Sequence, residues 1–378
     1  MSKGMAAAAS YQRKLQRRIA QTAALPPSPE RDALLRREVH RYSTSPGVKA
    51  AHLRRMKHLR HKSDANISRL ADRINVLTPC TQPVTWWPKE KRSGGVRRIC
   101  SPPTKVRLGQ RIGKDLIAAQ VRPDTCLYDW PGRGIHRCVA DIGAALQTAG
   151  PHAFIIDIRH CYESVRLDSL YVMNILPDEL IRSCIDARHL TFRRSHRQCD
   201  LPDHMVAGLC SADPTGVMAG GPASAAIVVA LIGNVSDSVS ASVWLGGYAD
   251  DFVVAGGERE IAVSAGEELA QYLTGCPLGS SEFKPFRIVD ARDGFHFLGC
   301  YFWQCVEPPE TCIPPDRLES IIEGMIANIE SIAETDDRDV DHHVRKALGP
   351  YGWAPTWQRD QIAEAAEDAL ARRSRLAG

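Results

Sequence analysis

The stretch Trp244 to Gly256, WLGGYADDFVVAG, places two adjacent carboxylates, Asp250 and Asp251, between two short apolar segments. Glycine pairs at 246–247 and 256–257 flank it, so the pattern predicts a strand, a tight acidic turn and a second strand. Neighbouring carboxylates repel each other, and a fold that holds them at a turn usually supplies a cation. Mg²⁺ binds carboxylate oxygens and substrate phosphates together. For the dipeptide alone, a solvated turn is the alternative.

A second acidic segment favours the functional interpretation. Residues 154–158 have the composition of a buried strand, with Asp157 near its end and Tyr162 five positions later. One carboxylate on such a strand and two in a later hairpin suit two-metal phosphoryl transfer. In that chemistry one ion activates a 3′-hydroxyl and the other stabilises the leaving pyrophosphate. We therefore expect Asp157, Asp250 and Asp251 to be catalytic.

These segments resemble the A and C motifs of reverse transcriptases, Asp-x₄-Tyr and YADD. The resemblance implies two Mg²⁺ ions, with Mn²⁺ as an alternative, held by Asp157, Ile158, Asp250 and Asp251. It also implies that Tyr162 lies beneath the nucleotide sugar and excludes a 2′-hydroxyl, so that dNTPs are selected. An aromatic packing residue is the alternative for this tyrosine.

Further motifs of the same family follow one another in the expected order across residues 89–302. The basic segment KEKRSGGVRRI, at 89–99, resembles the fingers hairpin, which implies that Lys91 and Arg97 bind the incoming triphosphate. Gly216, Gly220 and Ser224 match a later motif, where the resemblance places Gly220 near the nucleotide. In that motif Ala219 replaces the glutamine that normally touches the templating pair, which puts template handling or fidelity in doubt.

Two motifs lie beyond the acidic hairpin. The stretch SSEFKPFRI, at 280–288, resembles the family's K-T-R-I motif, which implies that Lys284 approaches the leaving pyrophosphate as a general acid. Phe297, Leu298 and Gly299 match the FLG hairpin that grips the primer.

Charge is distributed unevenly along the 378 residues. Residues 1–70 hold 16 Lys and Arg against 4 Asp and Glu, although the net charge of the whole chain is only +4. Such a basic region indicates a polyanionic partner, with Arg54, Arg55 and Lys57 as candidate RNA-binding residues; a solvated helical face is the alternative. The twelve cysteines form no CxxC pair, which favours reduced thiols over a zinc site.

The expected fold is α+β, with the right-hand arrangement of polymerases. We expect a basic helical N-terminal region at 1–75, fingers and palm at 76–302, and a short helical thumb at 303–378. The palm should be an antiparallel sheet of the split βαβ kind. The uncharged stretch 216–235 is interrupted by Gly-Gly-Pro and predicts a buried helix rather than a membrane span.

The favoured function is DNA synthesis on an RNA template, by an enzyme resembling the stand-alone bacterial reverse transcriptases of antiviral defence (the unknown-group and abortive-infection types). These are related to group II intron, retron and diversity-generating enzymes, and the assignment to defence rests on analogy. The expected partners are an RNA template such as a structured noncoding RNA, the DNA product, dNTPs, and an accessory protein or further copies of the chain. No signal-peptide pattern opens the sequence, so we expect a cytoplasmic protein without membrane partners.

Two other functions remain open. One is a template-independent or protein-primed DNA polymerase on the same palm, for which Ala219 is the hint. The other is a catalytically silent RNA-binding scaffold, against which the intact Asp157, Asp250 and Asp251 speak.

Overall fold

The computed structural model describes residues 3–90, 96–195, 215–279, 281–303, 310–331, 340–349 and 354–376. It is a mixture of helices and mainly antiparallel sheets, which confirms the α+β class. Contacts divide the chain into two discontinuous units. The first comprises Met1–Asp124, Arg159–Asn234 and Leu273–Glu282; the second comprises Thr125–Ile158, Val235–Tyr272 and Phe283–Gly378. The three functional regions predicted from the sequence remain a prediction.

The first unit begins with four helices, three of which start at a serine cap. They are α1 (Lys3–Ala23), α2 (Pro29–Thr44), α3 (Pro46–Arg54) and α4 (Asp64–Arg73). The side chains of Ser28, Ser45 and Ser63 each accept a hydrogen bond from a backbone N–H in the first turn of α2, α3 and α4. These bonds satisfy amides that a helix start leaves without intrahelical partners.

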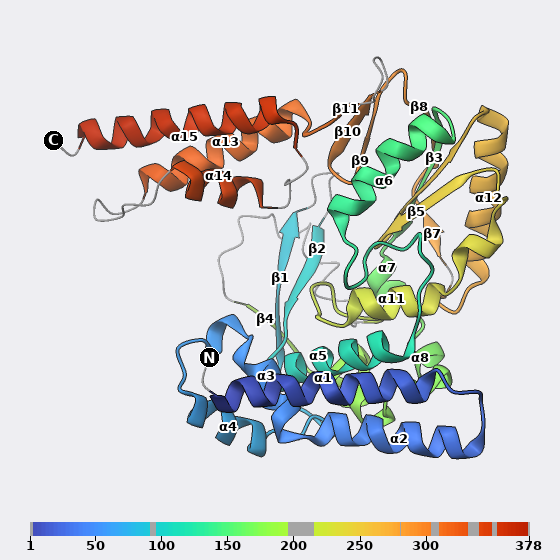
Figure 1. Ribbon diagram of the computed structural model, residues 1–378, viewed down its shortest axis with the longest axis vertical. Helices are drawn as coiled ribbons and strands as arrows, with labels where there is room; N and C mark the ends of the chain where they lie inside the picture. Colours follow the sequence, from blue (N-terminus) through green and yellow to red (C-terminus); the bar gives the residue numbers. More distant parts are fainter. Residues whose placement is uncertain are drawn as a thin grey trace. The chain divides into compact units, whose positions relative to one another are not determined.

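One carboxylate ties three of these helices to α5 (Thr104–Gln120), which lies beside them in Figure 1. Asp115 Oδ2 accepts hydrogen bonds from Gln12 Nε2 at 2.7 Å and from the Tyr42 hydroxyl, and His52 Nε2 lies 3.0 Å away. Burial alone would raise the pKa of Asp115, but the hydrogen bond and charge of His52, with the bonds from Tyr42 and Gln12, hold it below its usual value. The basic N-terminal helices are therefore part of the packed first unit.

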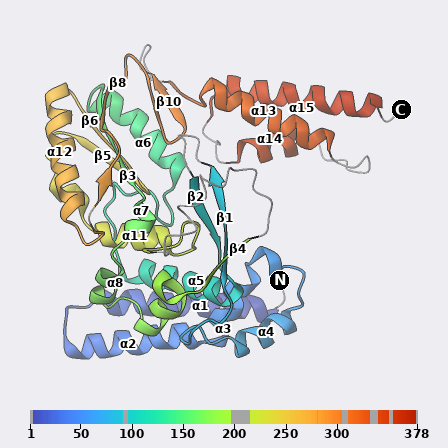
Figure 2. The same ribbon diagram turned by 180° about the vertical axis from the view of Figure 1, so that it is seen from behind.

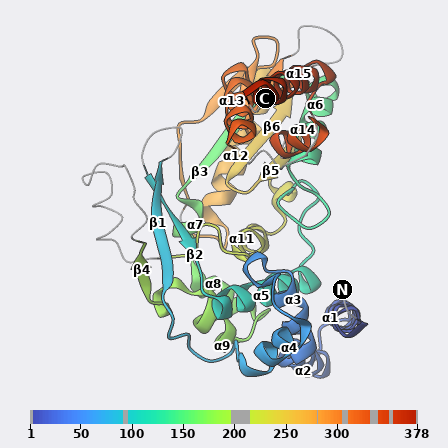
Figure 3. The ribbon, with the colours of Figure 1, turned by 90° about the vertical axis from the view of Figure 1, so that its left-hand side faces the viewer.

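A small sheet completes this unit together with short helices. In the sheet, β1 (Val84–Glu90) pairs antiparallel with β2 (Val96–Ser101) and parallel with β4 (Phe192–Arg194), as Figure 3 shows. The other helical elements are η1 (Lys57–Leu59), α7 (Cys161–Ser164), α8 (Leu167–Met173), α9 (Asp178–Leu180), η2 (Ile181–Ile185), η3 (Ala187–His189) and α11 (Ser224–Ile232). The buried helix expected within 216–235 is α11.

The second unit is built on a five-stranded sheet. Its strands are β5 (Trp244–Tyr248), β6 (Asp251–Gly256), β3 (His152–Arg159), β7 (Glu282–Phe283) and β8 (Arg287–Asp290). The order is β5-β6-β3-β7, and β8 also pairs with β3. The pairs β3–β6, β5–β6 and β3–β8 are antiparallel.

Two helices, α6 (Ile135–Thr148) and α12 (Arg259–Gly275), pack against this sheet (Figure 2). Ile155 and Val253 share a core with buried side chains of α6. Phe154 points to the opposite face, because neighbouring strand residues alternate. There it meets α12 at Gly266, where an added Cβ would lie 2.3 Å from the phenyl ring. The sheet is thus covered on both faces.

Two further groups of elements belong to the second unit. A three-stranded sheet contains β9 (Phe295–Phe297), β10 (Cys300–Trp303) and β11 (Glu310–Cys312). The short 3-10 helix η4 (Val235–Ser238) precedes β5. The helices α13 (Pro315–Glu330), α14 (Val340–Leu348) and α15 (Thr356–Leu376) share an apolar core of their own, where the sequence predicts a helical thumb. No helix in the described ranges has both the length and the apolar character that a membrane span requires.

Candidate active site

The acidic hairpin predicted from the sequence is present, and it opposes the end of β3. In the β5–β6 hairpin, Tyr248 pairs with Asp251 across the two-residue turn formed by Ala249 and Asp250. The neighbouring register places Asp157 of β3 directly opposite Asp251. Because side chains alternate along a strand, Asp157 and Asp251 point to the face that also carries Ile155 and Val253.

Backbone hydrogen bonds fix the two acidic segments to each other and to the segment that carries Lys284. The N–H of Ile158 donates to the carbonyl oxygen of Asp250 at 2.9 Å. The N–H of Lys284 donates to the carbonyl oxygen of Asp157, also at 2.9 Å. Ala249 has a φ of +56°, a left-handed conformation that costs an alanine about 1 to 2 kcal/mol. The turn therefore holds a strained geometry at the point where its carboxylates meet β3.

The side chain of Lys284 contacts one carboxylate of this cluster. Its Nζ lies 2.5 Å from Asp157 Oδ2, and the lysine side chain is 47% exposed. The other oxygen, Asp157 Oδ1, is buried and has no hydrogen-bond partner among the residues that the structure describes. A buried carboxylate oxygen without a donor costs free energy, so this atom is suited to a ligand that brings positive charge.

Electrostatics point to the same need for a cation. Burial, together with the charges of Asp250 and Asp157, raises the pKa of Asp251 to about 7, although Lys284 and Arg287 act in the opposite direction. The carboxylates are therefore held together at a cost that two nearby cations only partly offset.

The residues present fit a divalent-cation site in their chemistry. Carboxylate oxygens are the ligands that Mg²⁺ prefers, and Mg²⁺ sites commonly use only one or two carboxylates and take further ligands from substrate phosphates and water. Within the described ranges, no group of three or more His, Cys, Asp or Glu side chains is arranged as a metal-binding cluster, so the protein itself would supply only part of the ligand set. The side chain of Ile158, which the resemblance placed at the metal site, is buried, and the backbone N–H of this residue donates to the carbonyl oxygen of Asp250.

The sequence did not single out Arg287, although it lies in the same 280–288 stretch as Lys284. Its guanidinium donates to the carbonyl oxygen of His296 at 3.0 Å, and its charge lowers the pKa of Asp251. On β8 it pairs with Ile155, two positions before Asp157. The arginine of the K-T-R-I motif, which Arg287 matches, is the sequence signal that could have identified it.

The predicted sugar-contacting residue, Tyr162, lies on α7 in the first unit. Its carbonyl oxygen accepts a hydrogen bond from the N–H of Val217 at 2.8 Å. Gly216 has a φ of +62°, and a Cβ there would lie 2.2 Å from the Tyr162 carbonyl oxygen. Only glycine allows the 216–224 segment to approach Tyr162 this closely.

The same segment reaches β2 of the first unit. The carbonyl oxygen of Ala219 accepts from the N–H of Cys100 at 3.3 Å, and Gly220, with a φ of +86°, follows directly. Arg97 is exposed on β2, opposite Lys89 of β1. The structure thus connects Tyr162, Gly220 and the strand of Arg97 through one segment, whereas Lys91 lies outside the described residues.

The predicted primer-grip residues form a hairpin in the second unit. Phe297 ends β9 and pairs with Cys300 of β10, and Leu298 and Gly299 form the two-residue turn between them. Both turn residues have positive φ, at +51° and +75°. A two-residue hairpin turn with positive φ at both positions matches the twist of the paired strands. Glycine adopts this conformation without strain, which explains its presence at position 299.

The three basic residues proposed to bind RNA differ in their surroundings. Arg54 donates to the carbonyl oxygens of Arg60 and Lys62, and its Nε lies 3.4 Å from Asp64, so it stabilises the turn after α3. The side chains of Arg55 and Lys57 make no hydrogen bond or ion pair with the part of the chain that the structure describes. Two further cations, Arg107 and Arg111 of α5, lie near Arg55. Burial and the charges of Arg107 and Arg55 lower the pKa of Arg111.

Comparisons with known proteins give little guidance. No protein-family profile matches the chain, and no curated protein sequence matches it. Among solved structures, the chain is similar to telomerase from Candida albicans in complex with a TWJ fragment of telomeric RNA, with a TM-score of 0.35 and 11% identity. The match covers 76% of this chain and 56% of that chain, so this chain spans little more than half of the telomerase length. A similarity of this size is too weak to assign a fold or an activity to this chain.

The raised pKa of Asp251 predicts an unusual dependence of stability on pH when no divalent cation is bound. An unfolded aspartate has a pKa of about 4, so the folded state binds the proton more tightly. The free energy of unfolding should therefore fall as the pH rises from about 4 to about 7, by an amount on the order of 3 kcal/mol. Asp251→Asn should flatten this fall and raise the melting temperature at pH 8, measured by thermal unfolding in EDTA.

Asp290→Asn is the matched control on the same sheet. Hydrogen bonds from Arg292 hold the pKa of Asp290 below its ordinary value, so this change should not stabilise the protein at pH 8. An Asp251→Asn variant with the wild-type pH slope would contradict the account of carboxylate repulsion.

Proposed function

We propose that the chain is a metal-dependent nucleotidyltransferase. The observation that carries the proposal is the cluster of Asp157, Asp250 and Asp251 at the end of β3, with the buried, unpartnered Oδ1 of Asp157 and the Nζ of Lys284 at the same point. A fold gains no stability from gathering like charges, so their retention indicates a ligand that neutralises them.

Each residue of the acidic site has a role in this proposal. Asp157, Asp250 and Asp251 hold two Mg²⁺ ions, which when bound supply Lewis-acid activation of a hydroxyl nucleophile and stabilise the leaving pyrophosphate. The main chain of Ile158 keeps the tip of the acidic hairpin in register with β3 through its bond to Asp250. Lys284 exchanges its contact with Asp157 for the triphosphate and donates a proton to the pyrophosphate.

Within this class we propose an RNA-directed DNA polymerase, a reverse transcriptase. The order of the sequence motifs supports it. Arg97, Lys91 and Gly220 then bind the incoming dNTP, the Phe297–Gly299 turn holds the primer end, and Arg55 and Lys57 contribute to binding the template RNA. A role in prokaryotic antiviral defence, with a structured noncoding RNA as template, remains a proposal by analogy alone.

Loss of one carboxylate charge tests the chemistry. Asp250→Asn should reduce Mg²⁺-dependent extension of a DNA primer on an RNA template at least about 100-fold, because several kcal/mol of transition-state stabilisation depend on the bound ions. The measurement is incorporation of labelled dNTPs in single-turnover primer extension. The exposed Asp237, on η4, provides the same substitution away from the site, and Asp237→Asn should keep wild-type activity.

The products of this assay also separate the alternatives. DNA whose sequence does not follow the template would favour the template-independent polymerase. RNA binding without any synthesis by the wild type would favour the scaffold. Wild-type synthesis by Asp250→Asn would refute the two-metal assignment.

The size of the ring at position 162 tests the proposed choice of sugar. Tyr162→Val should raise incorporation of rNTPs relative to dNTPs at least about tenfold, because the bulk that meets a 2′-hydroxyl is lost. Tyr162→Phe keeps the ring and should keep the discrimination. Competition assays with paired rNTP and dNTP substrates measure the ratio. If the valine variant extended primers with unchanged discrimination, Tyr162 would be a packing residue.

A further inference from the structure

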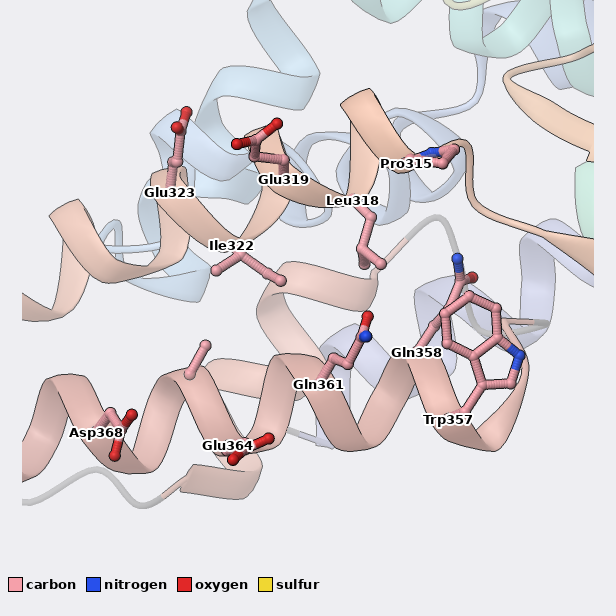
Figure 4. Close-up of a pocket in the computed structure, with 11 residues that line it drawn as sticks. Pro315, Leu318, Glu319, Ile322, Glu323, Trp357, Gln358, Gln361, Glu364 and Asp368 are labelled. Atoms are coloured by element: carbon pink, nitrogen blue, oxygen red, sulfur yellow. The ribbon is translucent and has the colours of Figure 1, made fainter.

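A groove of about 600 Å³ runs between α13 and α15 in the second unit (Figure 4). The two helices run in the same direction, since Pro315 and Trp357 lie at one end of the groove and Glu323 and Asp368 at the other. Beyond the acidic end, the Arg372 guanidinium lies 3.7 Å from the Glu330 carboxylate. The helices therefore diverge little along the groove.

The other end of the groove is fixed by a buried amide. Gln358 is fully buried; its Nε2 donates to the carbonyl oxygen of Ile313, and its Oε1 accepts from the N–H of Ile313, each at 2.7 Å. This reciprocal pair joins the first turn of α15 to the segment before α13. The groove is thus a preformed feature of the helical core, which reduces the entropic cost of filling it.

The floor of the groove is apolar. Leu318 belongs to the core of the three helices, and Ile322 and Ala365 pack partly buried against that core. At one end the indole of Trp357 is 46% exposed and faces the groove. A large exposed aromatic ring beside an apolar floor is typical of a surface that buries a partner's side chains.

The rims carry negative charge on both helices. Glu319 and Glu323 lie along α13, and Glu364 and Asp368 lie along α15. All four are exposed, and none forms a hydrogen bond or ion pair with a residue that the structure describes. The described residues that line the groove include no Lys, Arg or His.

This arrangement is unfavourable for the isolated helices. Each rim places two carboxylates four residues apart, and like charges at this spacing destabilise a helix by about 0.2 to 0.5 kcal/mol. Cations from a partner would remove that repulsion on both rims at once. The same charges disfavour a nucleic-acid backbone on this face.

We infer that the α13–α15 groove binds a cationic amphipathic helix of a partner protein. From Trp357 to Asp368 the groove follows twelve residues of α15, and the eleven steps between them correspond to about 16 Å or three helical turns. The partner helix presents apolar residues at i, i+3 or i+4, and i+7 to the floor, with Lys and Arg on both flanks. Charge complementarity with four rim carboxylates selects this occupant.

The test uses the full chain and a fluorescein-labelled 15-residue peptide of Leu and Lys at helical spacing, with binding measured by anisotropy. Glu364→Lys with Asp368→Lys should weaken binding at least tenfold. Asp360 and Glu367 are exposed carboxylates of the same helix that do not line the groove. Asp360→Lys with Glu367→Lys makes the same change in net charge and should leave the dissociation constant within about twofold.

Two further measurements complete the test. A scrambled peptide of the same composition should bind at least tenfold more weakly, and Trp357→Ala should weaken binding of the amphipathic peptide. Circular dichroism and thermal unfolding establish that each variant is folded. None of these measurements depends on polymerase activity, so the result is independent of the proposed function.

Several outcomes would overturn the inference. Equal losses in the two lysine pairs, or no loss in either, would mean that the peptide responds only to general surface charge. A dimer in sedimentation analysis that Glu364→Lys with Asp368→Lys abolishes, without peptide binding by the wild type, would place a second copy of the chain in the groove. Loss of single-stranded RNA binding in Trp357→Ala, with peptide binding unchanged, would assign this face to nucleic acid.

Discussion

The mutual repulsion of Asp157, Asp250 and Asp251 is the constraint on which the proposed site depends. The antiparallel register places Asp157 opposite Asp251, and the hydrogen bond from Ile158 to Asp250 fixes the turn that carries the third carboxylate. Burial and these neighbours then raise the pKa of Asp251 to about 7. Lys284 offsets part of the repulsion through Asp157. The left-handed Ala249 adds backbone strain to the same turn. Strain and repulsion gathered at one point are typical of a functional site rather than a stabilising one.

The rest of the second unit supplies the rigidity that this arrangement requires. Phe154 and Ile155 anchor β3 on opposite faces, the first against α12 and the second in the core shared with α6. A strand fixed on both faces cannot shift its register by one residue, because every side chain would then change face. The position of Asp157 is therefore set by apolar packing that lies outside the acidic cluster.

Much of the site could be predicted from local sequence, because hairpins and short strands leave local patterns. The acidic turn, the turn at Leu298 and Gly299, and the helix within 216–235 all follow from residue types within a short window. The strand β4 could not be predicted, since three residues, Phe-Arg-Arg, carry no periodicity and its pairing with β1 is tertiary.

Long-range contacts account for the remaining differences. Asp115 stands in a basic helical pattern, and nothing near it indicates that Gln12, Tyr42 and His52 would meet at one of its oxygens. Arg54 and Arg55 are identical as residue types, yet the first is engaged within the chain through the carbonyls of Arg60 and Lys62. The acidic groove likewise requires two helices that lie far apart in sequence. Charge counts along a chain cannot distinguish these cases.

Direct measurement of metal binding tests the central claim that the carboxylate cluster is a cation site. Titration of the protein with Mn²⁺, followed by the loss of the free-ion signal in electron paramagnetic resonance, reports binding without requiring catalysis. The wild type should bind Mn²⁺, Asp157→Asn should weaken that binding at least about tenfold because a charged ligand is lost, and Asp290→Asn should leave it unchanged. Equal Mn²⁺ affinity of the wild type and Asp157→Asn, or no binding by the wild type, would contradict the account.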